Sequence, residues 1–380
     1  MVSKVVKILA TGDFQLDKSF GTLGEHAVLF RKQLMATFNE VIMKHASDHD
    51  LVLIAGDLFD RKATPTSVIE AAADTMARCT THCVVLPGNH DPVNSGIPSV
   101  LAEALHQRGA THVHVAVKRE PIPLPKLGLT LYPAPLFRKD DISDQWSWIP
   151  DRTKEDGFRV ALMHGALDSL PNGMIPKNLA KTKDLDLVIC GDQHGPSSGD
   201  DEASDLFNLD TSRARKLYYA MAPEAQHINQ NFTGAYLSIT LDKKGSIVNE
   251  ERIQVGELRF INVHHEFRAD ENEPTETIKS YFSQFKERPP ELTSIRLTLD
   301  GELTSDTFVA LQSELTDQIQ RWPLLDLRNN IKLVDEISTI NETEPVIKTL
   351  MEAVEENERL NSKMKAKIME LLRLNIGRWN

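Results

Sequence analysis

The chain has 380 residues, of which 41% are hydrophobic and 26% are charged. These proportions are ordinary for a folded globular protein and exclude an extensively disordered one, and the length favours a large domain followed by a smaller unit. The formal net charge of -12 works against non-specific attraction to a polyanion, so any contact with DNA needs a local basic patch or a bound metal.

The start of the chain carries only a short apolar run, which Gly12 and Asp13 interrupt. This run is too short for a secretory signal or a membrane span, so a cytoplasmic protein without membrane contact is expected. Three cysteines, Cys79, Cys83 and Cys190, lie in or beside apolar stretches and lack the spacing of a metal finger. They are expected to be reduced, buried thiols rather than disulfides or metal ligands.

Five short apolar runs in the first two thirds of the chain predict strands that are covered on both faces, as in an α/β sheet. They span residues 5–9, 51–55, 83–87, 158–163 and 185–190. Helical patterns lie between the first strands, at residues 26–46, 65–78 and 97–108. Pro65 stands near a helix start and Gly109 at a helix end. The alternation predicts an α/β fold.

From residue 217 to residue 255 the pattern changes to β structure, and its last two segments are expected to form a hairpin through the turn at 242–245. A first domain would therefore cover residues 1–255. The sequence then reads strand, helix, strand, helix, strand, at residues 258–267, 275–286, 294–299, 305–320 and 325–334. This order predicts a small β-α-β-α-β domain over residues 256–338.

The remaining residues, 339–380, are predicted to be helical between 343 and 374, with a break near Asn361. Such an amphipathic pair either packs on its own chain or docks on a partner. Three basic clusters, Arg61 with Lys62, residues 177–183 and residues 213–216, are candidate contacts for a polyanion, although most such clusters are simply solvated.

Five short polar segments follow or end the predicted strands: GDFQLD from Gly12, GDLFD from Gly56, PGNHD from Pro87, MHG from Met163 and GDQHG from Gly191. Each alone has an ordinary explanation, because a strand-end aspartate is commonly a cap or turn residue and a lone histidine is commonly a structural one. Together they bring carboxylates, an amide and imidazoles to the strand ends where α/β sheets place their sites. These groups are divalent-metal ligands, so the set predicts a metal site.

This series resembles the calcineurin-like metallophosphoesterases, whose pattern is D-x-H, G-D-x-x-D, G-N-H-D/E, a later H, and G-H-x-H. GDLFD, PGNHD, the size of the first domain and the trailing β-α-β-α-β unit are similar to the SbcD-type DNA double-strand-break repair nucleases. The resemblance implies a sandwich of β-sheets flanked by helices, followed by a cap domain and C-terminal helices.

Carried over by motif, the resemblance implies two metal positions that Asp57 would bridge. Their ligands would be Asp13, Gln15 and His194 at the first position, and Asn89, His164 and Asp192 at the second. Two such ions would share a hydroxide and clamp the attacking and leaving oxygens of a phosphodiester. Manganese is the first expectation, and iron, magnesium and zinc are the alternatives.

The resemblance also gives a role to two further residues. His90 would stabilise the transition state or protonate the leaving oxygen. Asp60 is expected to support its neighbours rather than to bind metal.

Two positions depart from the family pattern: Gln15 stands where D-x-H has histidine, and Asp192 stands where G-H-x-H has its first histidine. Glutamine offers a neutral carbonyl oxygen, a weaker ligand for transition metals than imidazole. Asp192 adds a negative charge and should favour harder ions such as manganese or magnesium. The acidic stretch at residues 197–210 would repel a polyanion if it overhung the site, and is otherwise typical of a mobile surface loop.

Three hypotheses for function follow. The first is a DNA exonuclease or endonuclease subunit that works with an SMC-like coiled-coil ATPase in DNA repair or defence, with residues 339–380 as the segment that docks. The second is a phosphoesterase for a small nucleotide substrate. The third is a scaffold or regulatory subunit whose site is weakened by Gln15 and Asp192. A homodimer is compatible with each of them.

Overall fold

The computed structural model describes residues 5–60, 63–154, 156–168, 174–195, 217–230, 232–242, 244–271 and 273–334, and positions 352, 354–356, 364, 365 and 368. The basic clusters at 61–62 and 213–216, the acidic stretch and nearly all of the predicted C-terminal helices lie outside these residues. The chain divides into two compact units, one made of Met1–Asn262 with Pro289–Arg296 and the other of Val263–Arg288 with Leu297–Asn380.

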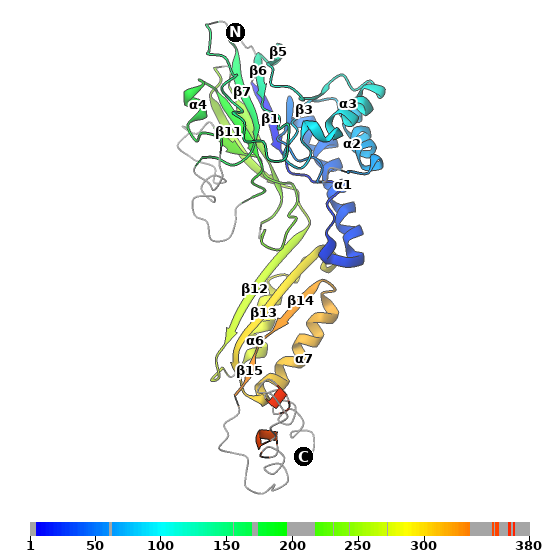
Figure 1. Cartoon of the computed structure of the whole chain (residues 1–380), viewed down its shortest axis with the longest axis vertical. Coiled ribbons are helices and arrows are strands. Elements are labelled where there is room, and N and C mark those ends of the chain that lie inside the picture. The colour runs from blue at the N-terminus through cyan, green and yellow to red at the C-terminus, as the bar shows by residue number, and fades with distance from the viewer. Residues whose placement is uncertain are drawn as a thin grey trace. The chain divides into compact units, whose positions relative to one another are not determined.

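The first unit contains two sheets and the helices beside them (Figure 1). One sheet has the order β11-β10-β1-β2-β3-β4, with strands β1 Val6–Thr11, β2 Leu51–Ile54, β3 His82–Val85, β4 Val113–Val115, β10 Ala235–Leu241 and β11 Ile247–Gln254. The other has the order β5-β6-β7-β8-β9, with strands β5 Ile122–Leu124, β6 Leu129–Pro133, β7 Phe158–His164, β8 Leu187–Gly191 and β9 Leu217–Tyr219. Strands β1 to β4 run parallel, as do β6 to β9, while β5, β10 and β11 pair antiparallel to their neighbours.

The helices of this unit are α1 Ala27–Met43, α2 Thr66–Arg78, α3 Ile97–Gln107 and α4 Leu179–Thr182, with short 3₁₀ helices η1 Gly21–His26, η2 His45–Asp48, η3 Val93–Ser95 and η4 Pro290–Leu292. Helices α1 to α3 lie beside the first sheet in Figure 1, and α4 packs next to β8 of the second. The predicted α/β fold and the predicted hairpin of β10 with β11 are confirmed.

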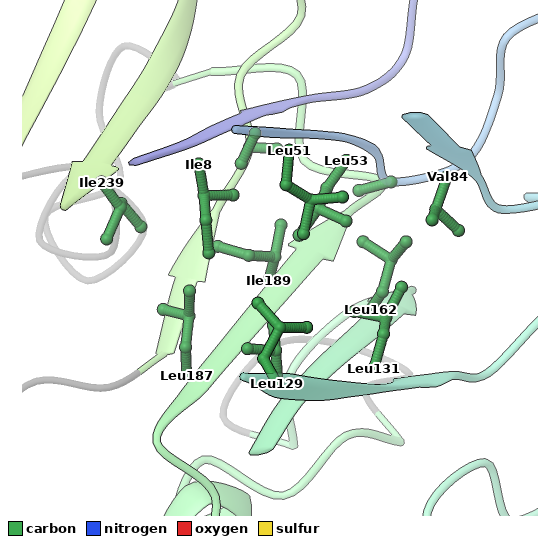
Figure 2. Packing of buried hydrophobic residues seen from close by; sticks show 14 of the residues in the cluster. Ile8, Leu51, Leu53, Val84, Leu129, Leu131, Leu162, Leu187, Ile189 and Ile239 are labelled. Carbon is green, nitrogen blue, oxygen red and sulfur yellow. The ribbon is translucent and has the colours of Figure 1, made fainter. Parts of the chain in front are cut away.

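The core lies between the two sheets (Figure 2). Along β1, Ile8 faces this core, while the alternate residue Leu9 is also fully buried but on the other face. The same holds for Leu162 and its neighbour Met163 on β7, where Met163 joins the cluster that includes α4. A strand covered on both faces has no polar side, which explains why the apolar runs in the sequence are continuous rather than alternating.

Glu224 links helix α1 to residues 257 and 258, which follow strand β11. Its buried carboxylate accepts hydrogen bonds from Thr37 Oγ1 at 2.5 Å and from the backbone N–H groups of Leu258 and Glu257 at 2.8 and 3.1 Å. Burial raises the pKa of Glu224 above its ordinary value, and these donors act against that shift.

The second unit contains most of strands β12 Arg259–Phe267 and β13 Thr293–Leu303, together with strands β14 Leu325–Asn329 and β15 Lys332–Leu333 and helices α6 Pro274–Ser283 and α7 Ser305–Arg321. The element order predicted for this region is present, but the single strand expected at residues 325–334 is wrong. It is two short strands, because the Asn329 side chain accepts the backbone N–H of Ile331 at 3.2 Å and makes a local turn. Strand β15 then pairs with β13.

All three cysteines are buried and free of disulfides. Among the helices that the structure describes, none is long and apolar enough to cross a membrane.

Candidate metal centre

The ends of five strands bring the predicted ligands together. Asp13, Asp57 and Asn89 follow β1, β2 and β3 of one sheet, whereas His164 ends β7 and Asp192 follows β8 of the other. The carboxyl ends of parallel strands meet at one edge of a sheet, and here the two sheets pack face to face, so both edges supply side chains to one place.

The backbone at this edge is held in an unusual conformation. Asp13, Gln15, Asp57 and Asp192 have φ angles of 50°, 46°, 51° and 92°, and they are four of the six non-glycine residues with positive φ among those described. The N–H of Asp13 donates to the carbonyl oxygen of Gly56, and the N–H of Gln15 donates to that of Asp57, both at 3.0 Å. Non-glycine residues in this region cost free energy and cluster at functional sites, where the surrounding structure holds them.

One group of donors converges around the ring of His164. Its Nδ1 lies 2.7 Å from the carbonyl oxygen of Ala55 and must donate to it, so a neutral ring presents its lone pair on Nε2. That Nε2 atom faces Asn89 Oδ1 at 3.3 Å, Asp57 Oδ1 at 3.5 Å and Asp192 Oδ1 at 3.9 Å. Three oxygens and a nitrogen lone pair cannot face one another without a cation or a proton between them, so this pocket fits a divalent metal ion. Asp13 belongs to the same group of possible ligands, because its carboxylate, that of Asp57 and the imidazole of His164 offer ligand atoms within 4.8 Å of one another.

Two glycines allow this convergence. A Cβ atom on Gly56 would lie 2.1 Å from His164 Nδ1, and one on Gly88 would lie 2.2 Å from Asp57 Oδ1. No side chain fits at these distances, so the glycines of the GDLFD and PGNHD segments are required for close approach of backbone and ligands.

The electrostatics of the pocket show the same crowding of negative charge. Burial, followed by repulsion from Asp57 and Asp192, raises the pKa of Asp13 well above its ordinary value. Burial is also the largest influence on His164 and lowers its pKa, but the carboxylates of Asp57, Asp13 and Asp192 together outweigh it and raise that pKa to about 9. A site that favours positive charge so strongly is suited to a metal cation.

A second group of predicted ligands, Asp13, Gln15 and His194, is adjacent but arranged differently. His194 Nε2 lies 3.8 Å from Asp13 Oδ1 and 3.5 Å from the Gln15 amide nitrogen, while Lys18 Nζ donates to Gln15 Oε1 at 2.6 Å. Burial, followed by the nearby Lys18 ammonium, lowers the pKa of His194 to about 3, so its imidazole is neutral. Because the oxygen of Gln15 accepts a hydrogen bond from the Lys18 ammonium, it is not directed at Asp13.

His90 lies at the side of the pocket with 29% of its side chain exposed. Its backbone N–H donates to Asp57 Oδ1 at 2.9 Å, and its Nδ1 lies 3.1 Å from Asp60 Oδ1 and 2.9 Å from the Asp60 carbonyl oxygen. The hydrogen bond to the Asp60 side chain is the largest influence on this imidazole and raises its pKa to about 9, despite burial. Asp60 thus contacts the imidazole of His90 through both its side chain and its backbone carbonyl oxygen.

All eight predicted site residues are connected by these contacts, whereas several of their partners were not foreseen. Gln226 Nε2 donates to the backbone oxygen of Asp13 at 2.5 Å, and Gln230 Nε2 lies 2.9 Å from His194 Nδ1. Lys18 was also missed. Asp91 could have been found as the last residue of PGNHD; it accepts the N–H groups of Gly88 and Phe59 and shapes that loop.

The two packed sheets thus hold a candidate divalent-metal pocket at the ends of their parallel strands. Residues 6–196, just over half of the chain, match the calcineurin-like phosphoesterases, and the chain belongs to this family. Its members use divalent metal ions. Comparison with curated proteins gives no match.

Several solved structures are similar over about two thirds of the chain. The protein TT1561 of Thermus thermophilus has 13% identity over 66% of this chain and 100% of its own, with a TM-score of 0.41. A dimetal phosphatase from Danio rerio has 9% identity over 66% of this chain and 99% of its own, with a TM-score of 0.38. A novel archaeal phosphodiesterase has 13% identity over 65% of this chain and 99% of its own, with a TM-score of 0.30.

Proposed function

We propose that this phosphoesterase cleaves DNA, as the nuclease subunit of a complex with an SMC-like coiled-coil ATPase in DNA repair or defence. The observation that carries the hydrolytic part of the proposal is the pocket around His164, where carboxylate and amide oxygens converge on an imidazole nitrogen. The nuclease part rests on the resemblance of the GDLFD and PGNHD segments and of the trailing β-α-β-α-β unit to the SbcD-type nucleases.

The residues of the pocket have distinct roles in this proposal. Asp57, Asn89, His164 and Asp192 would hold a divalent ion, which supplies a Lewis acid and an acidified water. Ala55 fixes the tautomer of His164 through its carbonyl oxygen, as outer-shell partners of metal-binding histidines do. Manganese is the first choice for the ion, since three of the four donors are oxygens, with magnesium, iron and zinc as alternatives.

His90 is the proposed general acid. Its Nδ1 is engaged by Asp60, while its Nε2 has no hydrogen-bond partner among the described residues and can donate to a substrate oxygen. Because the raised pKa keeps the imidazole protonated at neutral pH, His90 can protonate the leaving oxygen or neutralise charge on phosphorus in the transition state.

A manganese-dependent assay on labelled linear and circular DNA tests the substrate. We expect cleavage of linear DNA that requires Mn²⁺ and stops with a chelator, and the circular form reports whether an end is needed. Bis(p-nitrophenyl) phosphate serves as a small phosphodiester in parallel. Hydrolysis of this ester without cleavage of either DNA would favour the small-substrate phosphoesterase, and no hydrolysis of any of them would favour the scaffold.

Removal of residues 343–380 tests the partner. If this segment docks on the coiled coil, the shortened chain should no longer be captured by the immobilised ATPase, while its hydrolysis of bis(p-nitrophenyl) phosphate stays unchanged. Capture that survives the truncation would contradict the docking role of this segment.

A further inference from the structure

The two histidines of the centre are held by opposite kinds of partner. His164 Nδ1 lies 2.7 Å from a carbonyl oxygen, so it carries a proton, and the ring that binds a metal presents its lone pair on Nε2, directed at Asp57 and Asn89. His194 Nδ1 instead lies 2.9 Å from the side-chain nitrogen of Gln230. An amide NH₂ group is only a donor, so this contact requires a lone pair on Nδ1 and leaves Nε2 as the nitrogen that carries the ring proton.

The direction of the Gln230 amide is fixed by the backbone. The N–H of Gln226 donates to Gln230 Oε1 at 2.7 Å, and a backbone N–H cannot act as an acceptor. If the amide were turned over, its NH₂ group would face that N–H, so the oxygen belongs on the Gln226 side and the nitrogen on the His194 side. The Nε2 atom of His194, which is the one nearest Asp13 at 3.8 Å, therefore carries hydrogen and is not a metal ligand.

The side-chain oxygen of Gln15 is likewise directed away from His194. Lys18 Nζ donates to its oxygen at 2.6 Å, so its NH₂ group is the end nearest His194, 3.5 Å from Nε2. That distance is too long for a good hydrogen bond, so the 2.9 Å contact with Gln230 decides the ring tautomer. Lys18 itself is held from the other side by Asp60, at 3.6 Å, and its side chain is 22% exposed. An ammonium thus binds the side-chain oxygen of Gln15, the residue that stands where the family pattern has a metal-binding histidine, and its positive charge opposes a second cation nearby.

We infer that the centre holds one divalent ion, at Asp57, Asn89, His164 and Asp192, and that Lys18 supplies the positive charge of the second position. The ammonium is the group that would meet a substrate phosphate there, as lysine does in other phosphate sites. This inference rests on the proposed metal-dependent function, and it replaces the two-ion centre that the resemblance implied with a mixed centre of one ion and one side-chain cation.

Manganese binding to the full chain, stripped of metal, measures the number of ions directly. We expect isothermal titration to give one ion per chain at micromolar to submillimolar Mn²⁺, and electron paramagnetic resonance to give the signal of isolated Mn²⁺. Two ions of comparable affinity, with the spectrum of an exchange-coupled pair, would overturn the inference.

A double variant should create the second site. Gln230→Glu keeps an oxygen for the N–H of Gln226 and turns the other oxygen to His194 Nδ1, so that the proton moves to Nδ1 and the lone pair to Nε2. Combined with Lys18→Met, which frees the Gln15 oxygen, it should strengthen binding of a second Mn²⁺ by roughly 10- to 100-fold, the usual contribution of an outer-shell partner. The matched control is Lys18→Met with Gln230→Met, which has no acceptor for His194 and should still bind one ion. Equal stoichiometry in the two double variants would contradict the tautomer argument.

Metal counting also separates this inference from the proposed function. One bound ion without DNA cleavage would leave the one-ion centre standing and refute the nuclease. Two bound ions with DNA cleavage would refute the one-ion centre and support the nuclease.

Discussion

Replacing Asp57 by asparagine is expected to abolish tight Mn²⁺ binding and to lower the rate of phosphodiester hydrolysis on the order of 10³-fold, equivalent to about 4 kcal/mol of lost transition-state stabilisation. Asp57 is the carboxylate that faces His164 Nε2 and accepts the His90 N–H, so it contributes to both halves of the site. Asparagine tolerates the φ angle of 51° and keeps an oxygen that can accept that N–H. The change therefore removes the charge and spares the backbone.

Titration calorimetry with Mn²⁺ and hydrolysis of bis(p-nitrophenyl) phosphate measure the two effects, and circular dichroism reports whether the variant is folded. The matched control is Asp151→Asn, because Asp151 is an exposed aspartate outside the centre. A folded Asp57→Asn protein that binds Mn²⁺ like the wild type would show that the pocket around His164 is not the metal site.

Replacing His90 by alanine is expected to lower the rate by roughly 10²- to 10⁴-fold, the usual contribution of a general acid, while Mn²⁺ affinity stays close to that of the wild type. The backbone N–H that His90 gives to Asp57 survives the change, so the pocket is preserved. His106, which is exposed on α3, provides the matched control as His106→Ala. Loss of Mn²⁺ binding in His90→Ala, or an unchanged rate, would refute this role.

The same residue predicts a pH dependence. A general acid acts only while it holds its proton, and the Asp60 carboxylate holds the pKa of His90 at about 9, above the ordinary 6.5. Activity should therefore fall as the pH rises through that region. In Asp60→Asn the carboxylate is lost, so the alkaline limb of the pH profile should move to lower pH; a limb that does not move would show that another group sets it.

Several strands could be predicted because they are buried on both faces. Strands β1, β2, β3, β7 and β8 follow from continuous apolar runs. Strands β4 and β5 were not predicted because each has three residues and is only partly buried. Strand β5 also contains Pro123, which has no backbone N–H to donate to a neighbouring strand and so disfavours a strand assignment. Their pairing depends on neighbours that are distant in the sequence.

The sequence predicts which residues form the site but not the hydrogen bonds that orient their side chains. Its motifs are local, so Asp13, Asp57, Asn89 and His164 are readable from the strand ends. The partner that orients His194 is not, because Gln230 lies 36 positions away in a segment without a motif. Which end of an amide faces a ring is decided by tertiary hydrogen bonds, and a sequence pattern carries no information about them.

The proposed metal ligands come from both sheets of the sandwich, Asp57 and Asn89 from one and His164 and Asp192 from the other. An ion bound by them would therefore cross-link the two layers as well as take part in the reaction. By mass action, an ion present at 100 times its dissociation constant stabilises the folded state by about 2.7 kcal/mol. Removal of the ion would weaken the packing of the two sheets at the edge where the carboxylates repel one another. The stability of the fold, as well as its activity, would therefore depend on the concentration of the metal.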